Sequence, residues 1–252
     1  MRTPFVAANW KMNCTRQEAE RLARELVERV GALDGVDIAL CPPYTAIETV
    51  RRAISGSRLH LGAQDVHWER QGAFTGEVSA EMLREAECEF VIIGHSERRQ
   101  YFGETDESVN RRLKAAAAAG LGAIMCVGER LVERESGRTI EVVERQLKDG
   151  LDGVGHEKIT IAYEPVWAIG TGKVATPEQA QEVHGFIRRW LRARYGEAAD
   201  RIRIQYGGGV KPDNVDGLMA QPDIDGSLVG GASLQAESFC GIVRGSVRTK
   251  RK

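Results

Sequence analysis

The chain has 252 residues, of which 42% are hydrophobic and 28% charged, and its formal net charge is −1. That length suits one large domain or two small ones, and a net charge near zero gives no electrostatic attraction to nucleic acid or to an anionic membrane. No apolar run approaches the ~20 residues of a membrane span, and the first residues do not form a signal peptide. We therefore expect neither a nucleic acid nor a membrane as partner.

The cysteines indicate the compartment in which the protein works. They are five in number, widely spaced and without a C-x-x-C pair, which argues against a disulfide framework and against a zinc site. This pattern fits a reducing cytosol. The five are Cys14, Cys41, Cys88, Cys126 and Cys240.

Eight short, β-rich apolar segments recur along the chain. They cover residues 5–8, 36–40, 59–63, 90–93, 123–127, 159–163, 202–206 and 227–229. Most are almost continuously apolar, which is typical of strands that are buried on both faces of a sheet.

Helix signals fill the intervals between these segments. Thr15 and Glu18 have the spacing of a capping box, and Gly31 stands where the helix that follows would end. A later helix begins in the same way, with Thr176 as its N-cap and Gln179 at the third helical position. Strands therefore alternate with helices.

Alternation of this kind predicts a parallel sheet, and eight units in 252 residues predict a closed (β/α)8 barrel that forms one domain over residues 1–252. The alternative is an open, doubly wound sheet. The G-x-G-x-x-G fingerprint that would support dinucleotide binding after the first strand is absent. In a barrel, catalytic residues lie where strands end.

The first strand ends in Asn9-Trp10-Lys11. A lysine directly after a buried strand needs a partner for its charge. Lys11 is either a fixed cation beside a phosphate or a developing oxyanion, or a lysine in an ordinary salt bridge.

The fourth strand leads to His95, which precedes a polar segment that can begin a helix. The partial positive charge of a helix N-terminus disfavours imidazolium and lowers the pKa of a histidine, and a neutral imidazole can polarise a carbonyl through its N–H. Glu97 would pair with Lys11 across the barrel mouth, or locally with Arg98 and Arg99.

The sixth strand delivers Glu164 at its end, followed by a proline and an apolar loop with two glycines. This is the arrangement of a general base beneath a lid, although a surface glutamate beside an ordinary connection has the same local sequence.

Glycines cluster after the last two strands, at Gly207-Gly208-Gly209 and Gly230-Gly231. Barrels often bind phosphate with the loops after strands seven and eight, where glycine lets backbone N–H groups approach the anion. No two histidines or carboxylates have the spacing of metal ligands. A Schiff-base aldolase would need a lysine at a strand end near the barrel centre, and Lys11 is the only candidate.

Five motifs in order resemble those of the triosephosphate isomerases, from the first strand to the last. They are the residues 8–13 (ANWKMN), 71–77 (QGAFTGE), 94–99 (GHSERR), 162–173 (AYEPVWAIGTGK) and 228–234 (LVGGASL).

The resemblance implies interconversion of dihydroxyacetone phosphate and D-glyceraldehyde 3-phosphate through an enediolate, without a cofactor or a metal. By the same resemblance Glu164 is the base and neutral His95 the electrophile. Lys11 is the cation that stabilises the enediolate, oriented with Asn9 and paired with Glu97.

The resemblance also implies a phosphate cradle made of Gly170 in the lid and the backbones of Gly209, Gly230 and Gly231. It implies a cytoplasmic enzyme of glycolysis and gluconeogenesis. It further implies a homodimer in which the loop from His67 to Glu77 enters the partner's site.

Two positions depart from the pattern of this family. Gly209 stands where a serine is usual, so we expect that Gly209→Ser lowers KM or raises kcat/KM by a hydrogen-bond-sized term of ~1 kcal/mol. Asp65 replaces a common asparagine and adds a negative charge whose partner the sequence does not indicate.

Two other functions remain open at this point. Another phosphate-binding barrel, such as an epimerase or a lyase, would need metal ligands or a second acid at the strand ends. A barrel that keeps the phosphate site as a sensor or scaffold would bind the ligand without turning it over.

Overall fold

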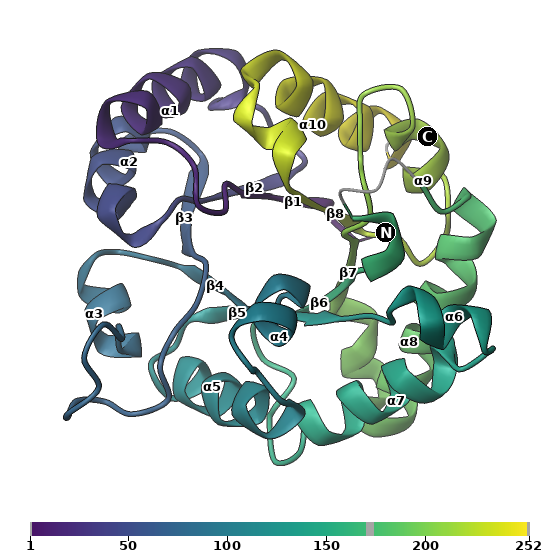
Figure 1. The fold of residues 1–252 in the computed structure, drawn as a ribbon. Helices are drawn as coiled ribbons and strands as arrows, with labels where there is room; N and C mark the ends of the chain where they lie inside the picture. Colours follow the sequence, from purple (N-terminus) through teal and green to yellow (C-terminus); the bar gives the residue numbers. More distant parts are fainter. Residues whose placement is uncertain (1, 170–173, 251–252) are drawn as a thin grey trace.

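Eight parallel strands follow one another around a closed barrel in chain order, and β8 pairs with β1 to complete the circle. This computed structural model describes residues 2–169 and 174–250. Figure 1 looks along the barrel and shows the helices as a ring outside the strands. The predicted (β/α)8 barrel is confirmed, and the open sheet is excluded because its edge strands would be unpaired.

Each predicted strand matches an observed one to within one residue at either end. The strands are β1 Phe5–Asn9, β2 Asp37–Cys41, β3 Leu59–Ala63, β4 Phe90–Ile93, β5 Gly122–Val127, β6 Ile159–Tyr163, β7 Arg203–Tyr206 and β8 Gly226–Val229.

The helices cover the outer face of the barrel. They are α1 Arg16–Val30, α2 Ile47–Ile54, α3 Ala80–Glu85, α4 Ser96–Tyr101, α5 Asp106–Ala118, α6 Leu131–Glu135, α7 Thr139–Gly150, α8 Pro177–Tyr195, α9 Val215–Met219 and α10 Ala236–Lys250. Short 3-10 turns are η1 Tyr44–Ala46, η2 Val166–Ala168, η3 Gly196–Arg201 and η4 Gly231–Leu234. Within residues 2–169 and 174–250, no helix combines the length and the apolar character that a membrane crossing requires.

Both predicted capping boxes are present. The Thr15 backbone N–H donates to Glu18 at 2.8 Å, and the Thr176 N–H donates to Gln179 at 3.0 Å. These bonds satisfy N–H groups that the first turn of a helix leaves without intrahelical partners, so they set where α1 and α8 begin.

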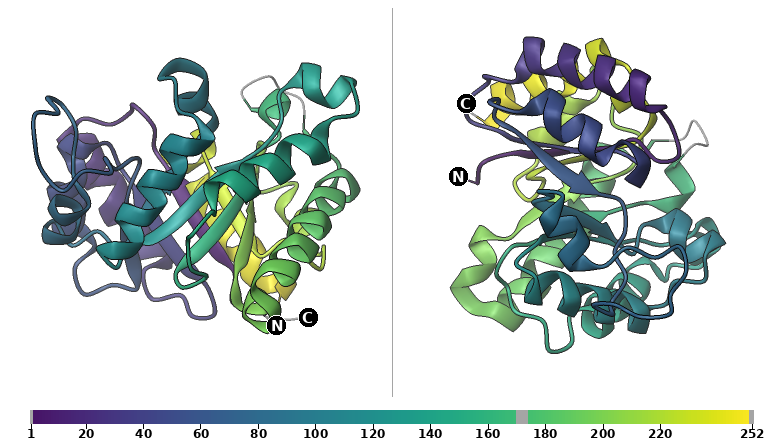
Figure 2. Two further views of the ribbon diagram at one scale, coloured as in Figure 1. Left: turned by 90° about the horizontal axis from the view of Figure 1, so that it is seen from below. Right: turned by 90° about the vertical axis from the view of Figure 1, so that its left-hand side faces the viewer.

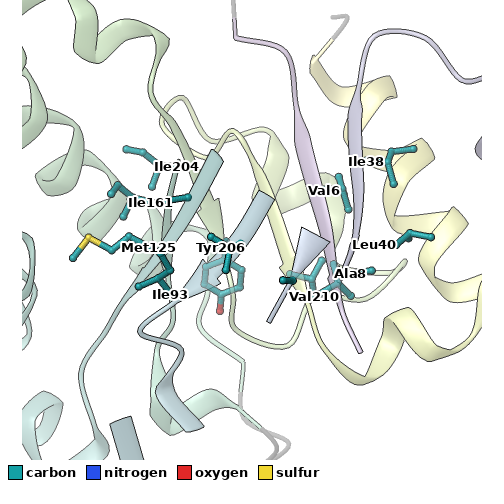
Figure 3. Packing of buried hydrophobic residues seen from close by; sticks show 14 of the residues in the cluster. Val6, Ala8, Ile38, Leu40, Ile93, Met125, Ile161, Ile204, Tyr206 and Val210 are labelled. Carbon is teal, nitrogen blue, oxygen red and sulfur yellow. The ribbon is translucent and has the colours of Figure 1, made fainter. Parts of the chain in front are cut away.

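The strands are buried on both faces, which explains their continuous apolar sequence. Side chains such as Val6, Ile38, Ile161 and Ile204 belong to the larger core cluster (Figure 3). Alternate positions belong to a smaller cluster inside the barrel, made of Phe5, Ala7, Ala39, Cys41, Ile92, Ile124, Cys126, Ala162 and Leu228. The interior is thus packed, and cavities are left at its ends.

The first and the last parts of the chain that the structure describes lie close together (Figure 2). Arg2 donates to the carbonyl of Pro222 at 2.9 Å, and Lys250 donates to the carbonyl of the adjacent Gln221 at 2.9 Å. Both therefore lie against the turn that leads into β8.

Candidate active site

A cavity of about 420 Å³ opens at the carboxyl end of the barrel, where the strands finish. Every predicted site residue within the described ranges lines it, whereas Gly170 lies outside the described residues. These lining residues are Asn9, Lys11, His95, Glu97, Glu164, Gly209, Gly230 and Gly231. Strands far apart in sequence meet here because parallel strands all end at one mouth.

His95 is the N-cap of α4, as its position before a polar segment predicts. Its Nδ1 accepts the backbone N–H of Glu97 at 3.2 Å, and its Nε2 lies 2.9 Å from Oε1 of Glu164. An Nδ1 that accepts a hydrogen bond carries no proton, so this geometry requires the neutral tautomer with its proton on Nε2. That N–H points into the cavity from a ring that is 5% exposed.

The direction of the pKa shift of His95 differs from the expectation based on the helix terminus. Burial opposes the imidazolium form, but the adjacent Glu164 carboxylate outweighs burial and raises the pKa of His95 above its ordinary value. The expected lowering of the pKa is therefore wrong for this arrangement of Glu164. Once the carboxylate turns away, burial and the helix N-terminus both favour the neutral ring.

Glu164 is 2% exposed and both of its carboxylate oxygens are hydrogen-bonded. Oε1 lies near His95, and Oε2 accepts the backbone N–H of Ser96 at 2.9 Å. Burial opposes ionisation, but His95 and the Ser96 N–H outweigh it and lower the pKa of Glu164. The carboxylate must leave both partners before it can act as a base, and leaving them raises its pKa and its basicity.

Two glycines that were not selected as site residues make room for Glu164. A Cβ on Gly128 would lie 1.7 Å from the Glu164 carbonyl oxygen, and a Cβ on Gly207 would lie 3.0 Å from its Cγ. Both positions therefore need glycine for close approach to the residue that follows β6. The sequence signal that could have identified both positions is a glycine directly after a strand, here after β5 and β7.

Lys11 is held in a strained backbone conformation with φ of 54°. Its N–H donates to Asn9 Oδ1 at 3.0 Å, and its Nζ lies 2.6 Å from Glu97 Oε1. The pairing of Glu97 across the mouth is therefore observed, whereas Arg99 pairs with Asp106 instead. Asn9 and Glu97 together aim the ammonium group into the cavity.

Asp65 has partners that the sequence did not indicate. Its carboxylate lies 2.8 Å from Arg98 and 3.2 Å from Arg112, and both arginines also pair with Glu104. Burial and the nearby Glu104 raise the pKa of Asp65 to about 6, against the lowering effect of the two arginines. This buried network joins the loop after β3 to α4 and α5.

The glycines after β7 and β8 form the remaining wall of the cavity. Gly209 has φ of +74°, a left-handed conformation that favours glycine, and a Cβ on Gly230 would lie 3.2 Å from Cε of Lys11. Lys211 also lines the cavity, although sequence analysis did not select it. Backbone N–H groups and a second ammonium thus surround this end of the cavity.

The segment that the sequence analysis interpreted as the start of a lid is anchored by Glu129, another residue that the analysis missed. Its Oε1 accepts the indole N–H of Trp167 at 2.8 Å and the hydroxyl of Tyr163 at 3.1 Å. The backbone N–H of Val166 donates to the Glu129 carbonyl at 3.1 Å. These bonds fix η2, directly before residues 170–173, which lie outside the described ranges.

Fold and site together define a (β/α)8 barrel whose cavity combines a buried carboxylate, a neutral imidazole and a lysine beside a glycine-rich wall. These groups can move a proton on a small anionic substrate. The sequence model of the triosephosphate isomerase family matches residues 4–246, and the chain belongs to that family.

Triosephosphate isomerases from other organisms are similar to this chain over nearly their whole length. The triosephosphate isomerase of Carboxydothermus hydrogenoformans is 57% identical, with 98% of this chain and 100% of the relative covered. That of Moorella thermoacetica is 58% identical, with 96% and 98% covered. The crystal structure of triosephosphate isomerase from Bartonella henselae superposes with a TM-score of 0.90 at 40% identity, covering 99% of this chain and 100% of that one.

Proposed function

We propose that Glu164, His95 and Lys11 carry out the isomerisation of this family, the interconversion of dihydroxyacetone phosphate and D-glyceraldehyde 3-phosphate. Family membership over nearly the whole chain supports the reaction. The observation that carries the residue roles is the 2.9 Å contact between Glu164 Oε1 and His95 Nε2 in a cavity that Lys11 also lines.

Glu164 is the base. Its carboxylate turns from His95 and Ser96 toward the substrate and takes the proton from the carbon next to the carbonyl. The electron pair of that C–H bond forms the C=C bond of an enediolate, and the carbonyl oxygen becomes an oxyanion. His95 Nε2 gives its proton to this oxyanion and takes a proton from the hydroxyl oxygen on the first carbon, which becomes the new carbonyl oxygen. Glu164 returns its proton to the second carbon, so the isomerisation ends without a net change in protons.

His95 and Lys11 stabilise the oxyanion. The Nε2–H of His95 donates to the oxygen on which negative charge develops, and the ammonium of Lys11 adds a fixed positive charge. Donors that are already oriented need no reorganisation at the moment of reaction, which is why such groups are effective. Asn9 and Glu97 are positioning residues for Lys11.

The glycines and Lys211 hold the phosphate. Gly209, Gly230 and Gly231 offer backbone N–H groups, and the lid that begins at η2, including Gly170, closes over the anion. A closed site excludes water and prevents the enediolate from losing its phosphate. Binding of the phosphate thus supplies free energy for closure at a distance from the reacting carbons.

The test is isomerisation of glyceraldehyde 3-phosphate, coupled to reduction of the ketone product, for the parent protein and for Glu164→Ala. We expect turnover in the parent and a loss of about 10²–10⁴-fold in the variant. Glu157→Ala, a carboxylate removed at the opposite end of the barrel, is the matched control and should leave turnover unchanged.

Two outcomes would contradict the proposal. A parent protein that binds phosphate ligands without turnover would favour a sensor or scaffold. Turnover that survives Glu164→Ala would assign the base to another residue.

We also propose that the chain forms a homodimer through the loop from His67 to Glu77. The ring of His67 contacts Trp68 and Phe74, with centroids 4.3 and 4.4 Å away, so the loop is internally packed. Phe74 nevertheless remains 41% exposed and Met12, beside Lys11, is 95% exposed. Light scattering should give a dimer for the parent and a monomer for Phe74→Asp, with Val132→Asp as control.

Two smaller proposals concern organisation and compartment. Residues 1–252 form one domain, a proposal that the pairing of the first strand with the last supports. The protein works in a reducing cytoplasm, since its five cysteines are free thiols.

A further inference from the structure

A second cavity, of about 480 Å³, opens at the amino end of the barrel, where the strands begin. Phe90, Gly122 and Ile159, the first residues of β4, β5 and β6, line its inner wall together with Thr160. Glu164 follows the last residue of β6, so roughly 13 Å of strand separates it from Thr160. This cavity is therefore distinct from the catalytic one.

The rim of this cavity carries three cationic side chains, those of Arg84, Lys158 and Arg201. Within the described ranges, no ion pair joins any of the three to a carboxylate. Arg84 donates to the carbonyl of Cys88 at 3.3 Å, and Lys158 donates to the carbonyl of Gly120 at 2.8 Å. Each of these three cations therefore contacts a backbone carbonyl or no protein acceptor, and none has a carboxylate as its direct partner in the described ranges.

The other charged groups of the cavity have partners of their own. Arg203 pairs with Asp37 and stacks on Phe5, with its Cζ 4.6 Å from the ring centroid. Glu89 lies 2.9 Å from His60 Nδ1, and Glu157 lies 3.6 Å from Nδ1 of His156. With Arg203 paired to Asp37, the three other cations face the carboxylates of Glu89 and Glu157, so the excess along the lining is one positive charge.

The backbone of Lys158 gives independent support. Its φ of 58° lies in the left-handed region, which costs a non-glycine residue about 1–2 kcal/mol. Strained residues of this kind concentrate at functional sites. Lys11, which has the same unusual conformation, lines the cavity at the other end.

We propose that the amino-end cavity binds a small polyanion of the phosphate class, such as pyrophosphate or the diphosphate group of an organic ligand. Arginine forks match phosphate oxygens in geometry, and several cations around one cavity suit a ligand with more than one charge. The rim is exposed, so water and salt weaken a single charge pair there. A ligand that binds at the rim must therefore form several charge pairs at once, as a polyanion does. A cavity of this volume accommodates a small molecule.

Calorimetric titration with pyrophosphate tests the proposal. Because the catalytic cavity also contains cations, the parent should bind two equivalents per chain. Lys158→Ser with Arg201→Ser should weaken one equivalent by about tenfold or more and keep the other, together with full isomerase activity. Lys11→Met should weaken the other equivalent instead.

The matched control removes the same charge elsewhere. Arg24→Ser with Arg52→Ser, on the exposed faces of α1 and α2, should keep both equivalents. Arg201→Gln alone tests the site without loss of any contact that the structure shows. Isomerase activity confirms that every variant except Lys11→Met is folded, and cooperative urea unfolding confirms it for Lys11→Met. A single equivalent in the parent that Lys11→Met abolishes, or equal weakening in the control, would overturn the proposal.

Discussion

At the carboxyl end of the barrel Glu164 and His95 are buried and in contact with each other, whereas at the amino end three cations are exposed and none of them pairs with a carboxylate of the described residues. Glu164 and His95 are 2% and 5% exposed and lie 2.9 Å apart. Lys158 and Arg201 lie at an open rim. Burial tunes groups for proton transfer, and exposed charge suits reversible binding of an anion, so the two ends suit different tasks.

The largest expected contrast in activity is between variants of Lys11 and Lys158, the two lysines with a left-handed backbone conformation. Lys11→Met should lower kcat/KM by about 10²–10³-fold, because it removes the cation beside the developing oxyanion. Lys158→Met, the same change at the amino end, should leave the coupled isomerase assay unchanged. Equal losses in the two variants would mean that the lysines act through stability and that the ends are not functionally separate.

Glycines at the two ends should also differ. Gly128→Ala forces the backbone of Glu164 to move and should cost about 3 kcal/mol of unfolding free energy along with most of kcat. A Cβ on Gly122 would lie 2.6 Å from Cδ1 of Phe90, a half-buried ring that can turn toward the cavity. Gly122→Ala should therefore cost about 1 kcal/mol in urea unfolding and spare kcat. A larger loss of unfolding free energy for Gly122→Ala than for Gly128→Ala would contradict the closer backbone contact at Gly128.

Buried charge at the carboxyl end predicts a pH effect. The pKa of Asp65 is about 6 in the folded chain against an ordinary 3.8, so folding takes up a proton between these values. The contribution of this carboxyl to stability is present below pH 3.8 and is lost as the pH rises through 6.

Asparagine does not ionise, so Asp65→Asn should not lose stability in this pH range as the parent does. The unfolding free energy of the variant minus that of the parent should therefore grow by about 2 kcal/mol between pH 4.5 and 7.5. Urea unfolding at several pH values measures this difference. Asp216→Asn, at an exposed pair with Arg248, is the control and should show no such growth. A flat difference for Asp65→Asn would mean that Arg98 and Arg112 fully compensate the carboxylate.

The smallest effect concerns Gly209. A serine there gains a hydrogen bond of ~1 kcal/mol, but at φ of +74° it bears a strain of about 1–2 kcal/mol. Because that strain is the same in the free and the substrate-bound chain, it lowers the free energy of unfolding and leaves kcat/KM to the hydrogen bond. Gly209→Ser should therefore still raise kcat/KM by about fivefold, ~1 kcal/mol, as the sequence predicts. Gly137→Ser, at φ of +70° in open space, measures the strain alone by unfolding. An unchanged or lower kcat/KM for Gly209→Ser would contradict the expectation from the sequence.

Much of the fold could be predicted because strands buried on both faces have an unmistakable sequence. The segment at 159–163 is apolar except for Thr160, and it forms β6 with the same bounds. Thr15 and Thr176 marked helix starts because their capping bonds are local. The site residues could be selected for a related reason, since Asn9, His95 and Glu164 end or follow strands whose carboxyl ends converge.

Other features depended on groups that are remote in sequence. Asp65 pairs with Arg98 and Arg112, which lie on two later helices, and no local sequence pattern indicates these pairs. The pKa of His95 moved upward because a carboxylate from β6 reached its ring. The amino-end cavity likewise joins connections that precede four different strands.

The sequence by itself determined the strand and helix succession, and through its motifs the family, the reaction and the residues at the carboxyl mouth. Backbone periodicity and capping are local, so they can be read along the chain. Only the tertiary structure decided the protonation energetics of Glu164 and His95, the network around Asp65, the left-handed backbone of Gly209 and the cationic cavity at the amino end. These properties depend on distances of a few ångströms between remote residues, because both electrostatic and packing energies change steeply over that range.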